Sequence, residues 1–320
     1  MISILLPTYN DASVLRQSIN SMLNQTYKDY ELLILDDGSA DNTLEIVSSF
    51  YDSRIRYIKL AHRGITETLN SGLQQARYNI IVRMDAGDLS LPDRLEKQLE
   101  HYVKLPQNTI VSCRYAVFDK KIRYTVPVST KSDAIKKRLA LHADFAHSSV
   151  MYNKEFILSF GGYKNVPLED YDLWLRTKNS AEFYIVDKIL LLIEYTSGRL
   201  STNNILQNYE NHYALQENYY KDLDTEFGIL KIKEKIAFRG WREYFYGDKK
   251  RARHYWKKLA LFILISPRII AALLFTYLPD TVFLFLKEFR IKFRLLYFYN
   301  YFSQENIYLR KQYAVLIRSI

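Results

Sequence analysis

The sequence predicts an α/β fold in which a mostly parallel sheet is flanked by helices and followed by a helical C-terminal extension. First, short apolar runs alternate with segments of helical periodicity through residues 1–83, with short connections between them. That alternation is typical of right-handed β–α–β crossovers. Second, polar clusters follow three of the apolar runs. Third, the composition becomes basic and aromatic from about residue 200.

The apolar run at residues 2–6 predicts a strand buried on both faces, because such strands read as continuous hydrophobic stretches. Alternating strands and helices are expected at residues 2–6, 14–23, 31–35, 43–50, 55–60, 64–76 and 79–83. Ligands of parallel sheets bind beyond the carboxyl ends of the strands. The polar clusters at residues 8–10, 36–39 and 85–88 are therefore expected at one rim of the sheet.

The alternation loosens after residue 100. Further strands are expected at residues 109–118, 148–152 and 183–195, with a helix near residues 132–141 between the first two. Gly161-Gly162 marks a turn, and the segment at residues 167–174 opens a helix rich in acidic residues. Asp170 and Trp174 are four positions apart and share one face of that helix.

The acidic turn at residues 85–88 is the stretch around which the chain is organised. Asp85 and Asp88 follow a short apolar strand, and Pro92 stands where the next helix is expected to start. Magnesium and manganese take oxygen ligands and need only one or two carboxylates when phosphates and water complete their coordination. The turn therefore predicts a cation that carries a phosphate, with a solvated Asp-rich turn as the alternative.

Charge is distributed unevenly along the chain. Residues 1–200 carry 25 Lys+Arg against 24 Asp+Glu, a net charge of +1, whereas residues 201–320 carry 20 against 11, a net charge of +9. Such an asymmetry indicates a polyanionic partner for the second segment. We place a boundary at residue 200, between a catalytic domain (1–200) and a basic, apolar, helical extension (201–320).

The extension predicts contact with an anionic membrane surface. Its apolar runs, at residues 259–265, 269–278 and 282–286, follow a basic cluster, and none approaches the ~20 residues that span a bilayer. A helical hairpin lying in the membrane interface fits this pattern. Packing onto the catalytic domain or a second subunit is the alternative, so an oligomer stays open. Nucleic acid is not expected, because the tail is too apolar between its basic clusters.

Cys113 is the only cysteine, so a disulfide within the chain is excluded, as is usual in a reducing compartment. The N-terminal apolar run is too short for a signal peptide and has no basic residue before it. We therefore expect a cytoplasmic protein, peripheral on the inner face of the cell membrane.

Five motifs, in order, resemble the bacterial family 2 inverting glycosyltransferases. They read PTYN, DDGSADNT, RMDAGDLSLPDRLEKQ, HSSVMY and LEDYDLWLR, and they cover roughly residues 1–195. The resemblance implies a GT-A fold, whose sheet is Rossmann-like, and a Mn²⁺ or Mg²⁺ cofactor. It also implies transfer of a sugar from a nucleotide-sugar donor, most simply a UDP-sugar, to a lipid-linked or growing surface glycan.

The same resemblance implies roles for individual residues. Tyr9 is expected to stack on the nucleobase and Asp37 to bond it, with Arg63 near the nucleotide. The donor site is also expected to include Pro7 and Arg83. The metal and diphosphate are assigned to Asp85 and Asp88. Many members carry an Asp where this chain has Gly87, which leaves open which of the two aspartates is the direct metal ligand.

Asp170 is the residue that the resemblance makes the catalytic base, and acceptor contacts are assigned to Glu169, His147 and Trp174. Each assignment has a structural alternative. Acids in a first helical turn favour the helix dipole, Tyr9 could be a turn aromatic, His147 a hydrogen-bonded structural histidine, and Trp174 a core residue.

A general base and a cation at the departing diphosphate are the chemistry that direct displacement at a sugar carbon needs, and direct displacement inverts the configuration. A nucleotidyltransferase on a similar sheet and a non-catalytic nucleotide-sugar-binding or membrane-binding protein are the remaining alternatives. The sequence does not define the sugar, the acceptor hydroxyl or the oligomeric state.

Overall fold

A computed structural model describes residues 1–119, 121–125, 130–139 and 143–194 of the 320-residue chain. In the C-terminal third it describes residues 211–212, 214–216, 236, 239–241, 243–244, 248–260, 273–274, 276–279 and 282. The described residues up to 194 belong to one compact unit, and those from 211 on belong to a second.

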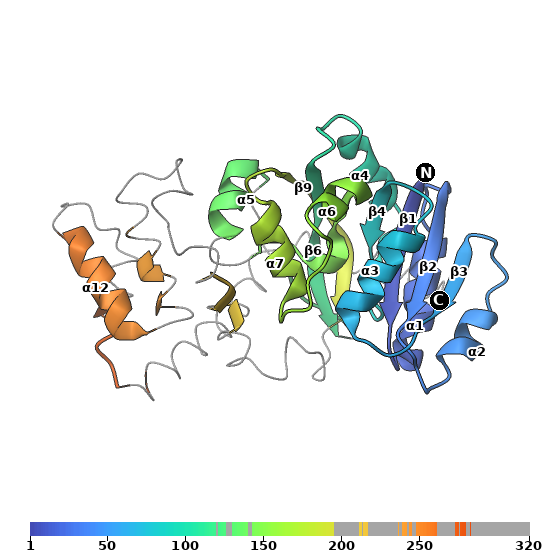
Figure 1. The fold of residues 1–320 in the computed structure, drawn as a ribbon, viewed down its shortest axis with the longest axis horizontal. Coiled ribbons are helices and arrows are strands. Elements are labelled where there is room, and N and C mark those ends of the chain that lie inside the picture. Colours follow the sequence, from blue (N-terminus) through green and yellow to red (C-terminus); the bar gives the residue numbers. More distant parts are fainter. Residues whose placement is uncertain are drawn as a thin grey trace. The chain divides into compact units, whose positions relative to one another are not determined.

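The first unit is built on one mixed sheet (Figure 1). Its strands run in the spatial order β3-β2-β1-β4-β8-β6-β9-β5, with β7 paired to β6. In chain order the strands are β1 (Ile2–Thr8), β2 (Tyr30–Asp36), β3 (Ile55–Lys59), β4 (Ile80–Arg83), β5 (Leu89–Ser90), β6 (Thr109–Asp119), β7 (Lys121–Thr125), β8 (Met151–Asn153) and β9 (Glu182–Glu194).

The predicted parallel core of the sheet is confirmed. Strands β1, β2, β3 and β4 are all parallel, and Ile2 of β1 pairs with Tyr30 of β2 and with Ile80 of β4. Strand β8 runs antiparallel to both β4 and β6, while β9 is parallel to β6. Because these strands run parallel, the carboxyl ends of β1, β2 and β4 lie together at one rim.

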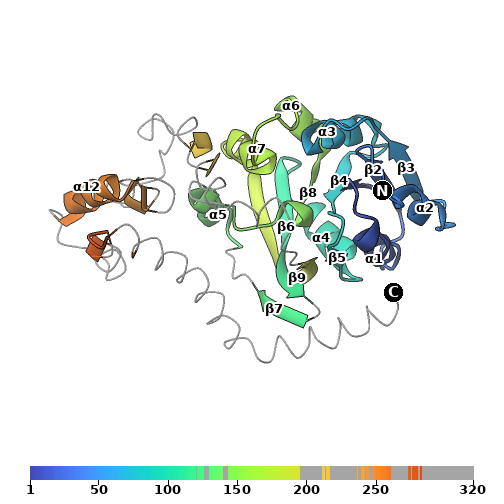
Figure 2. The same ribbon diagram turned by 90° about the horizontal axis from the view of Figure 1, so that it is seen from below.

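Helices cover both faces of the sheet (Figure 2), with α1 and α4 on one face and α3, α6 and α7 on the other. The helices of this unit are α1 (Ala12–Leu23), α2 (Thr43–Ser48), α3 (Ile65–Gln75), α4 (Arg94–Tyr102), α5 (Ser132–Leu139), α6 (Lys154–Ser159) and α7 (Glu169–Thr177), with a 3₁₀ turn at His147–Ser149. The second unit contains α12 (Lys249–Ala260). Within the described part of the chain, no helix is long and apolar enough to cross a bilayer.

Alternation along the strands divides the core between the two faces. Ile4 and Leu6 lie in a buried cluster with the α1 residues Ile19 and Met22. Leu5, between them in sequence, faces α3, where a Cβ on Gly72 would stand 3.3 Å from its side chain and 2.4 Å from that of Leu35. The lack of a side chain at Gly72 thus lets α3 pack closely on β1 and β2.

The structure departs from the predicted elements where signals were too short. Strand β5 has two residues and helix α6 has six, so neither shows a period in the sequence. Helix α4 begins at Arg94, not at Pro92. The apolar run at 148–152 begins as a 3₁₀ turn, in which the Ser149 amide donates to the carbonyl of Ala146 at 3.0 Å and the Ser149 hydroxyl donates to the same carbonyl at 2.6 Å.

Candidate active site

Hydrogen bonds join the loops that follow β1 and β2. The amide of Asp37 donates to the carbonyl of Thr8 at 2.9 Å, and the amide of Asn10 donates to the Ser39 hydroxyl at 3.0 Å. Asn10 takes a left-handed conformation with φ of 55°, which asparagine tolerates better than most residues. These contacts bring Tyr9 and Asp37 to the same part of the rim.

Tyr9 is 44% exposed, and its ring stacks on that of His62, with 4.1 Å between ring centroids and 14° between planes. The Asp37 carboxylate is buried and accepts three N–H donors from the loop after β3. They are the amide of Arg63 at 2.9 Å, the amide of Gly64 at 3.0 Å and the ring Nδ1 of His62 at 2.8 Å. Asp37 therefore ties the predicted nucleobase site to the start of α3.

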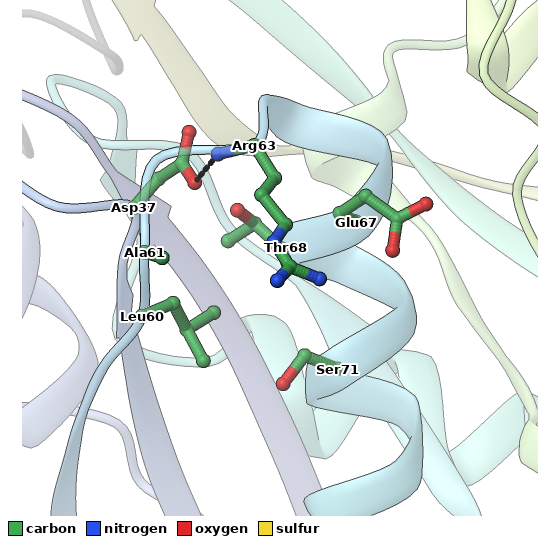
Figure 3. A pocket seen from close by; sticks show the side chains of 7 residues that line it. All are labelled: Asp37, Leu60, Ala61, Arg63, Glu67, Thr68 and Ser71. Atoms are coloured by element: carbon green, nitrogen blue, oxygen red, sulfur yellow. Dashed lines mark hydrogen bonds between the residues drawn. The ribbon is translucent and has the colours of Figure 1, made fainter.

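A pocket of about 210 Å³ opens beside these residues (Figure 3). Figure 3 shows the Arg63 side chain extending from the loop in front of helix α3, beside Leu60 and Ser71. The lining of the pocket includes both the cationic side chain of Arg63 and the Asp37 carboxylate. Its full lining is Asp37, Leu60, Ala61, Arg63, Glu67, Thr68 and Ser71.

The acidic turn after β4 is built on a buried arginine. The Arg83 side chain is 1% exposed, and its Nη2 donates to the Asp85 carboxylate at 2.7 Å, while its Nη1 donates to the carbonyls of Leu5 and Met84. Asp85 is 37% exposed, so this carboxylate reaches the rim. Gly87 has a φ of 91°, a conformation in which an aspartate would be strained.

Asp88 has no exposed surface. Its carboxylate accepts the hydroxyl of Ser148 at 2.7 Å and the amide of Glu194 at 3.3 Å, which connects the turn to the 3₁₀ segment and to the end of β9. These two contacts occupy both carboxylate oxygens of Asp88, one of the two predicted candidates for the direct metal ligand. Of the two aspartates, Asp85 is exposed at the rim, whereas Asp88 is buried and links the turn to the neighbouring segments.

The acidic pair lies at the first turn of α7, after Leu168, which takes a left-handed conformation with φ of 59°. Burial, reinforced by the neighbouring Asp170, raises the pKa of Glu169 to about 7. The pKa of Asp170 is also raised, chiefly by burial and then by the negative charge of Asp85. A carboxyl group whose pKa lies near neutral pH, as that of Glu169 does, is suited to acid–base chemistry.

His147 joins the two acidic segments. Its Nε2 accepts the Nε–H of Arg83 at 3.2 Å and lies 2.9 Å from the hydroxyl of Tyr163, while its Nδ1 lies 3.8 Å from Glu169. Burial and the adjacent arginine hold the pKa of His147 well below its usual value. Because the arginine can only donate, the neutral ring carries its proton on Nδ1, the atom that faces Glu169.

Three residues that were predicted to contact ligands have buried side chains. Trp174 has no exposed surface and packs against Phe145 and His147, so it is a core residue and not a surface for an acceptor. Pro7 is buried within β1, and Arg83 is buried beneath the turn. Their side chains are therefore not exposed at the rim, where both were predicted to contact the donor.

Sequence reasoning missed three residues of this rim, namely His62, Tyr163 and Arg94. Arg94 is fully buried and donates to the carbonyls of Arg83 and Ser148, at 2.9 and 2.8 Å. It thereby holds the end of β4 against the 3₁₀ turn. The only sequence signal for Arg94 was its position as a basic residue in the first turn of the helix after the acidic motif. Such a residue is equally typical of a charge exposed to solvent.

Comparison with known proteins agrees with this geometry. The model of the family "Glycosyl transferase family 2" matches residues 3–165. The chain is 32% identical over 244 residues to the O-antigen biosynthesis glycosyltransferase WbnJ of Escherichia coli, covering 71% of this chain and 92% of that protein. It is 33% identical over 189 residues to the putative glycosyltransferase EpsE of Bacillus subtilis, covering 55% of this chain and 66% of that protein.

Solved structures show the same GT-A fold. S. aureus TarS 1–349 in complex with UDP-GlcNAc superposes with a TM-score of 0.56 at 13% identity, covering 86% of this chain and 89% of that one. The mannosyltransferase PcManGT from Pyrobaculum calidifontis, in complex with GDP-Man and Mn²⁺, superposes with a TM-score of 0.56 at 14% identity. The superposition covers 99% of this chain and 85% of that one.

Proposed function

Because this chain belongs to glycosyltransferase family 2, we propose that it transfers a sugar from a UDP-sugar to a hydroxyl group of a lipid-linked or growing cell-surface glycan, with inversion at the anomeric carbon. The O-antigen role of WbnJ and the UDP-GlcNAc complex of TarS support the choice of acceptor class and donor. The observation that carries the proposal is the convergence of Tyr9, Asp37, Asp85 and Asp170 on one rim of the sheet.

The donor is proposed to lie across the carboxyl ends of β1, β2 and β4. Its base would lie at Tyr9 and Asp37, with the cationic side chain of Arg63 beside it. Its diphosphate would lie over the turn that presents Asp85, the carboxylate open to solvent there. Residues 1–200 would then supply the whole donor site, as the predicted domain boundary requires.

The residues at the turn fit a divalent cation bound mainly by phosphate. Among the described residues no group of three or more His, Cys, Asp or Glu side chains is arranged to hold a metal ion. A single accessible carboxylate suffices when diphosphate oxygens and water complete the coordination of Mg²⁺ or Mn²⁺. Asp85 would hold the cation, and a bound cation would stabilise negative charge on the departing diphosphate.

Asp170 is proposed to act as the base. Its carboxylate removes the proton of the acceptor hydroxyl, and the acceptor oxygen forms a bond to the anomeric carbon while the bond from that carbon to the diphosphate oxygen breaks. The nucleoside diphosphate then leaves with the bonding electrons. Glu169 and His147 line the same side of the rim and are proposed to contact the acceptor.

The test is an assay of the full-length chain with a panel of nucleotide sugars, Mn²⁺ and lipid-linked saccharide acceptors. Release of UDP together with a product of inverted anomeric configuration, determined by NMR, is expected. Release of pyrophosphate would indicate a nucleotidyltransferase instead. An Asp85→Ala variant is expected to lose donor binding, whereas turnover by this variant at the wild-type rate would refute the proposed donor site.

We also propose that the second unit binds an anionic membrane surface on the cytoplasmic side. One face of α12 packs through Ala252 and Trp256 against Tyr244 and Trp241. The face exposed to solvent is basic and carries Lys250, Arg251, His254, Lys257 and Lys258. Exposed apolar side chains from the same unit, Leu274, Tyr277 and Val282, are 65%, 55% and 40% exposed, and basic and aromatic groups together favour a lipid interface.

Flotation with vesicles tests this surface. Reversal of charge at Lys250, Lys257 and Lys258 to Glu is expected to release the protein from vesicles rich in phosphatidylglycerol. Reversal at Lys28, Lys104 and Lys131, exposed lysines of the first unit, is the matched control and is expected to leave binding unchanged. Equal flotation of both variants would count against membrane binding by α12.

A further inference from the structure

His62 has no role in the proposed reaction, yet it makes two of the contacts at the rim. It lies in the loop between β3 and α3, and its ring stacks on the ring of Tyr9 at 4.1 Å. Its Nδ1 lies 2.8 Å from the carboxylate and 3.1 Å from the carbonyl oxygen of Asp37. Because both of these oxygens can only accept, Nδ1 carries a hydrogen and donates to Asp37.

These contacts match what a nucleobase would offer. A pyrimidine or purine presents a flat aromatic face to Tyr9, and a ring N–H can donate to the carboxylate of Asp37. His62 supplies both features from within the chain. Since the two rings already lie at van der Waals distance, no third ring fits between them, and the face of Tyr9 that His62 covers is closed to a ligand.

We propose that His62 is an internal stand-in for the nucleobase, which the incoming nucleotide displaces from Tyr9 and Asp37. The inference rests on the proposed donor site. His62 then sets the affinity for nucleotide, because only the fraction of molecules with an open Tyr9 face binds, and the apparent dissociation constant rises as that fraction falls.

The local structure allows this exchange without disturbing Asp37. The His62 side chain is 55% exposed, so it has room to rotate to another staggered rotamer. When it leaves, the amides of Arg63 and Gly64 still donate to the carboxylate and hold it in place. Only one acceptor position on Asp37 is vacated, and it is the position that a base N–H would take.

Base specificity follows from the same hydrogen bond. A carboxylate that accepts from the imidazole N–H favours bases with a ring N–H, such as uracil at N3 or guanine at N1. Cytosine and adenine present an acceptor nitrogen at the corresponding positions and would meet the carboxylate unfavourably. The ligands expected at this site are therefore nucleoside diphosphates of imide-type or lactam-type bases.

The experiment is isothermal titration calorimetry of UDP, GDP, CDP and inorganic pyrophosphate in the presence of Mg²⁺. His62→Ala is expected to tighten UDP binding about five- to tenfold and to leave pyrophosphate binding unchanged, because pyrophosphate has no base. UDP is expected to bind more tightly than CDP. The matched control is His101→Ala, which removes another histidine–tyrosine ring pair, with Tyr184 at 4.8 Å, in helix α4.

Unchanged or weaker UDP binding by His62→Ala would overturn the role of His62 while leaving the donor site standing. A wild-type chain that binds neither UDP nor GDP would overturn both. If the variant fails to fold, the imidazole NMR signal of His62 in the wild-type chain decides the matter. That signal is expected to shift with UDP, as the ring leaves Tyr9, and not with pyrophosphate; a signal unmoved by saturating UDP contradicts the proposal.

Discussion

Glu31 lies near the amino end of β2, whereas Glu169 lies in the first turn of α7, within electrostatic reach of Asp85 at the carboxyl end of β4. The surroundings of these two glutamates favour opposite protonation states. Glu31, near the start of β2, accepts the Ser3 hydroxyl and an Arg56 N–H, each at 2.6 Å, and the Arg77 amide at 2.7 Å. Burial opposes ionisation, but these donors outweigh it and hold the pKa of Glu31 below its usual value. Burial raises the pKa of Glu169 to about 7.

The difference shows that one residue type can have two roles: Glu31 stabilises the fold, and Glu169 is suited to acid–base chemistry. A carboxylate surrounded by donors is a fixed anion that links strands and loops. A half-buried carboxyl beside a second acid keeps its proton close to neutral pH, which destabilises the anion but leaves it reactive. Substitutions of Glu169 or Asp170, near the carboxyl ends of the strands, should therefore affect turnover. Substitutions of Glu31, near the amino end of β2, should affect stability.

The largest effect on turnover is expected at Asp170, near the carboxyl ends of the strands. Asp170→Asn removes the proposed base and is expected to lower kcat by about 10²–10⁴-fold, while the melting temperature stays close to that of the wild-type chain. Steady-state kinetics and thermal unfolding of the same preparation check both expectations. Retention of turnover by this variant would show that the base is another residue.

Glu31→Gln is expected to do the reverse. The neutral amide weakens charge-assisted hydrogen bonds from Ser3, Arg56 and Arg77, at a cost of about 2 kcal/mol in the free energy of unfolding. Urea denaturation measures this cost, and kcat below the transition is expected to be unchanged. The control is Glu45→Gln on the exposed face of α2, where a change within ±0.5 kcal/mol is expected.

Glu31 and Glu169 are expected to change the stability of the protein in opposite directions as the pH rises. The lowered pKa of Glu31 contributes stability that is present above its unfolded pKa of 4.5 and is lost as pH falls through the folded value. The raised pKa of Glu169 contributes stability that is present below 4.5 and is lost as pH rises through about 7.

Glu169→Gln should therefore remove part of the decline in stability between about pH 4.5 and pH 7. We expect the melting temperature of this variant to exceed that of the wild-type chain by roughly 2–4 °C at pH 8 and to match it more closely at pH 5. Thermal unfolding across this range checks the sign. A variant that loses stability with rising pH as steeply as the wild-type chain would assign the decline to another group.

The smallest effect is expected at Leu168, which introduces the acidic pair in a left-handed conformation at φ of 59°. Leu168→Gly relieves backbone strain but adds flexibility to the unfolded chain, so we expect a net gain of only about 0.5 kcal/mol. Denaturant unfolding measures the gain. A simultaneous fall in kcat would show that the strained residue positions Glu169 and Asp170 for turnover.

The sequence by itself determined the parallel core of the sheet, the rim at which the site lies and the family of the chain. Apolar runs and helical periodicity report burial and period, which are local properties, and the five motifs carry the family resemblance. Asp37 and Asp85 were predicted as site residues because each follows a strand end, and Asp170 because the motif at the start of α7 resembles that of the family.

Only the tertiary structure decided which of these side chains is open to a ligand. Asp85 and Asp88 read alike in the sequence, yet Ser148, 60 residues away in sequence, buries the second. In the same way, His62 reaches Tyr9 and Asp37 from another loop, and Arg83 and Arg94 become buried supports of the rim. The reason is physical: exposure and hydrogen-bond partners arise from segments distant along the chain, which no local pattern records.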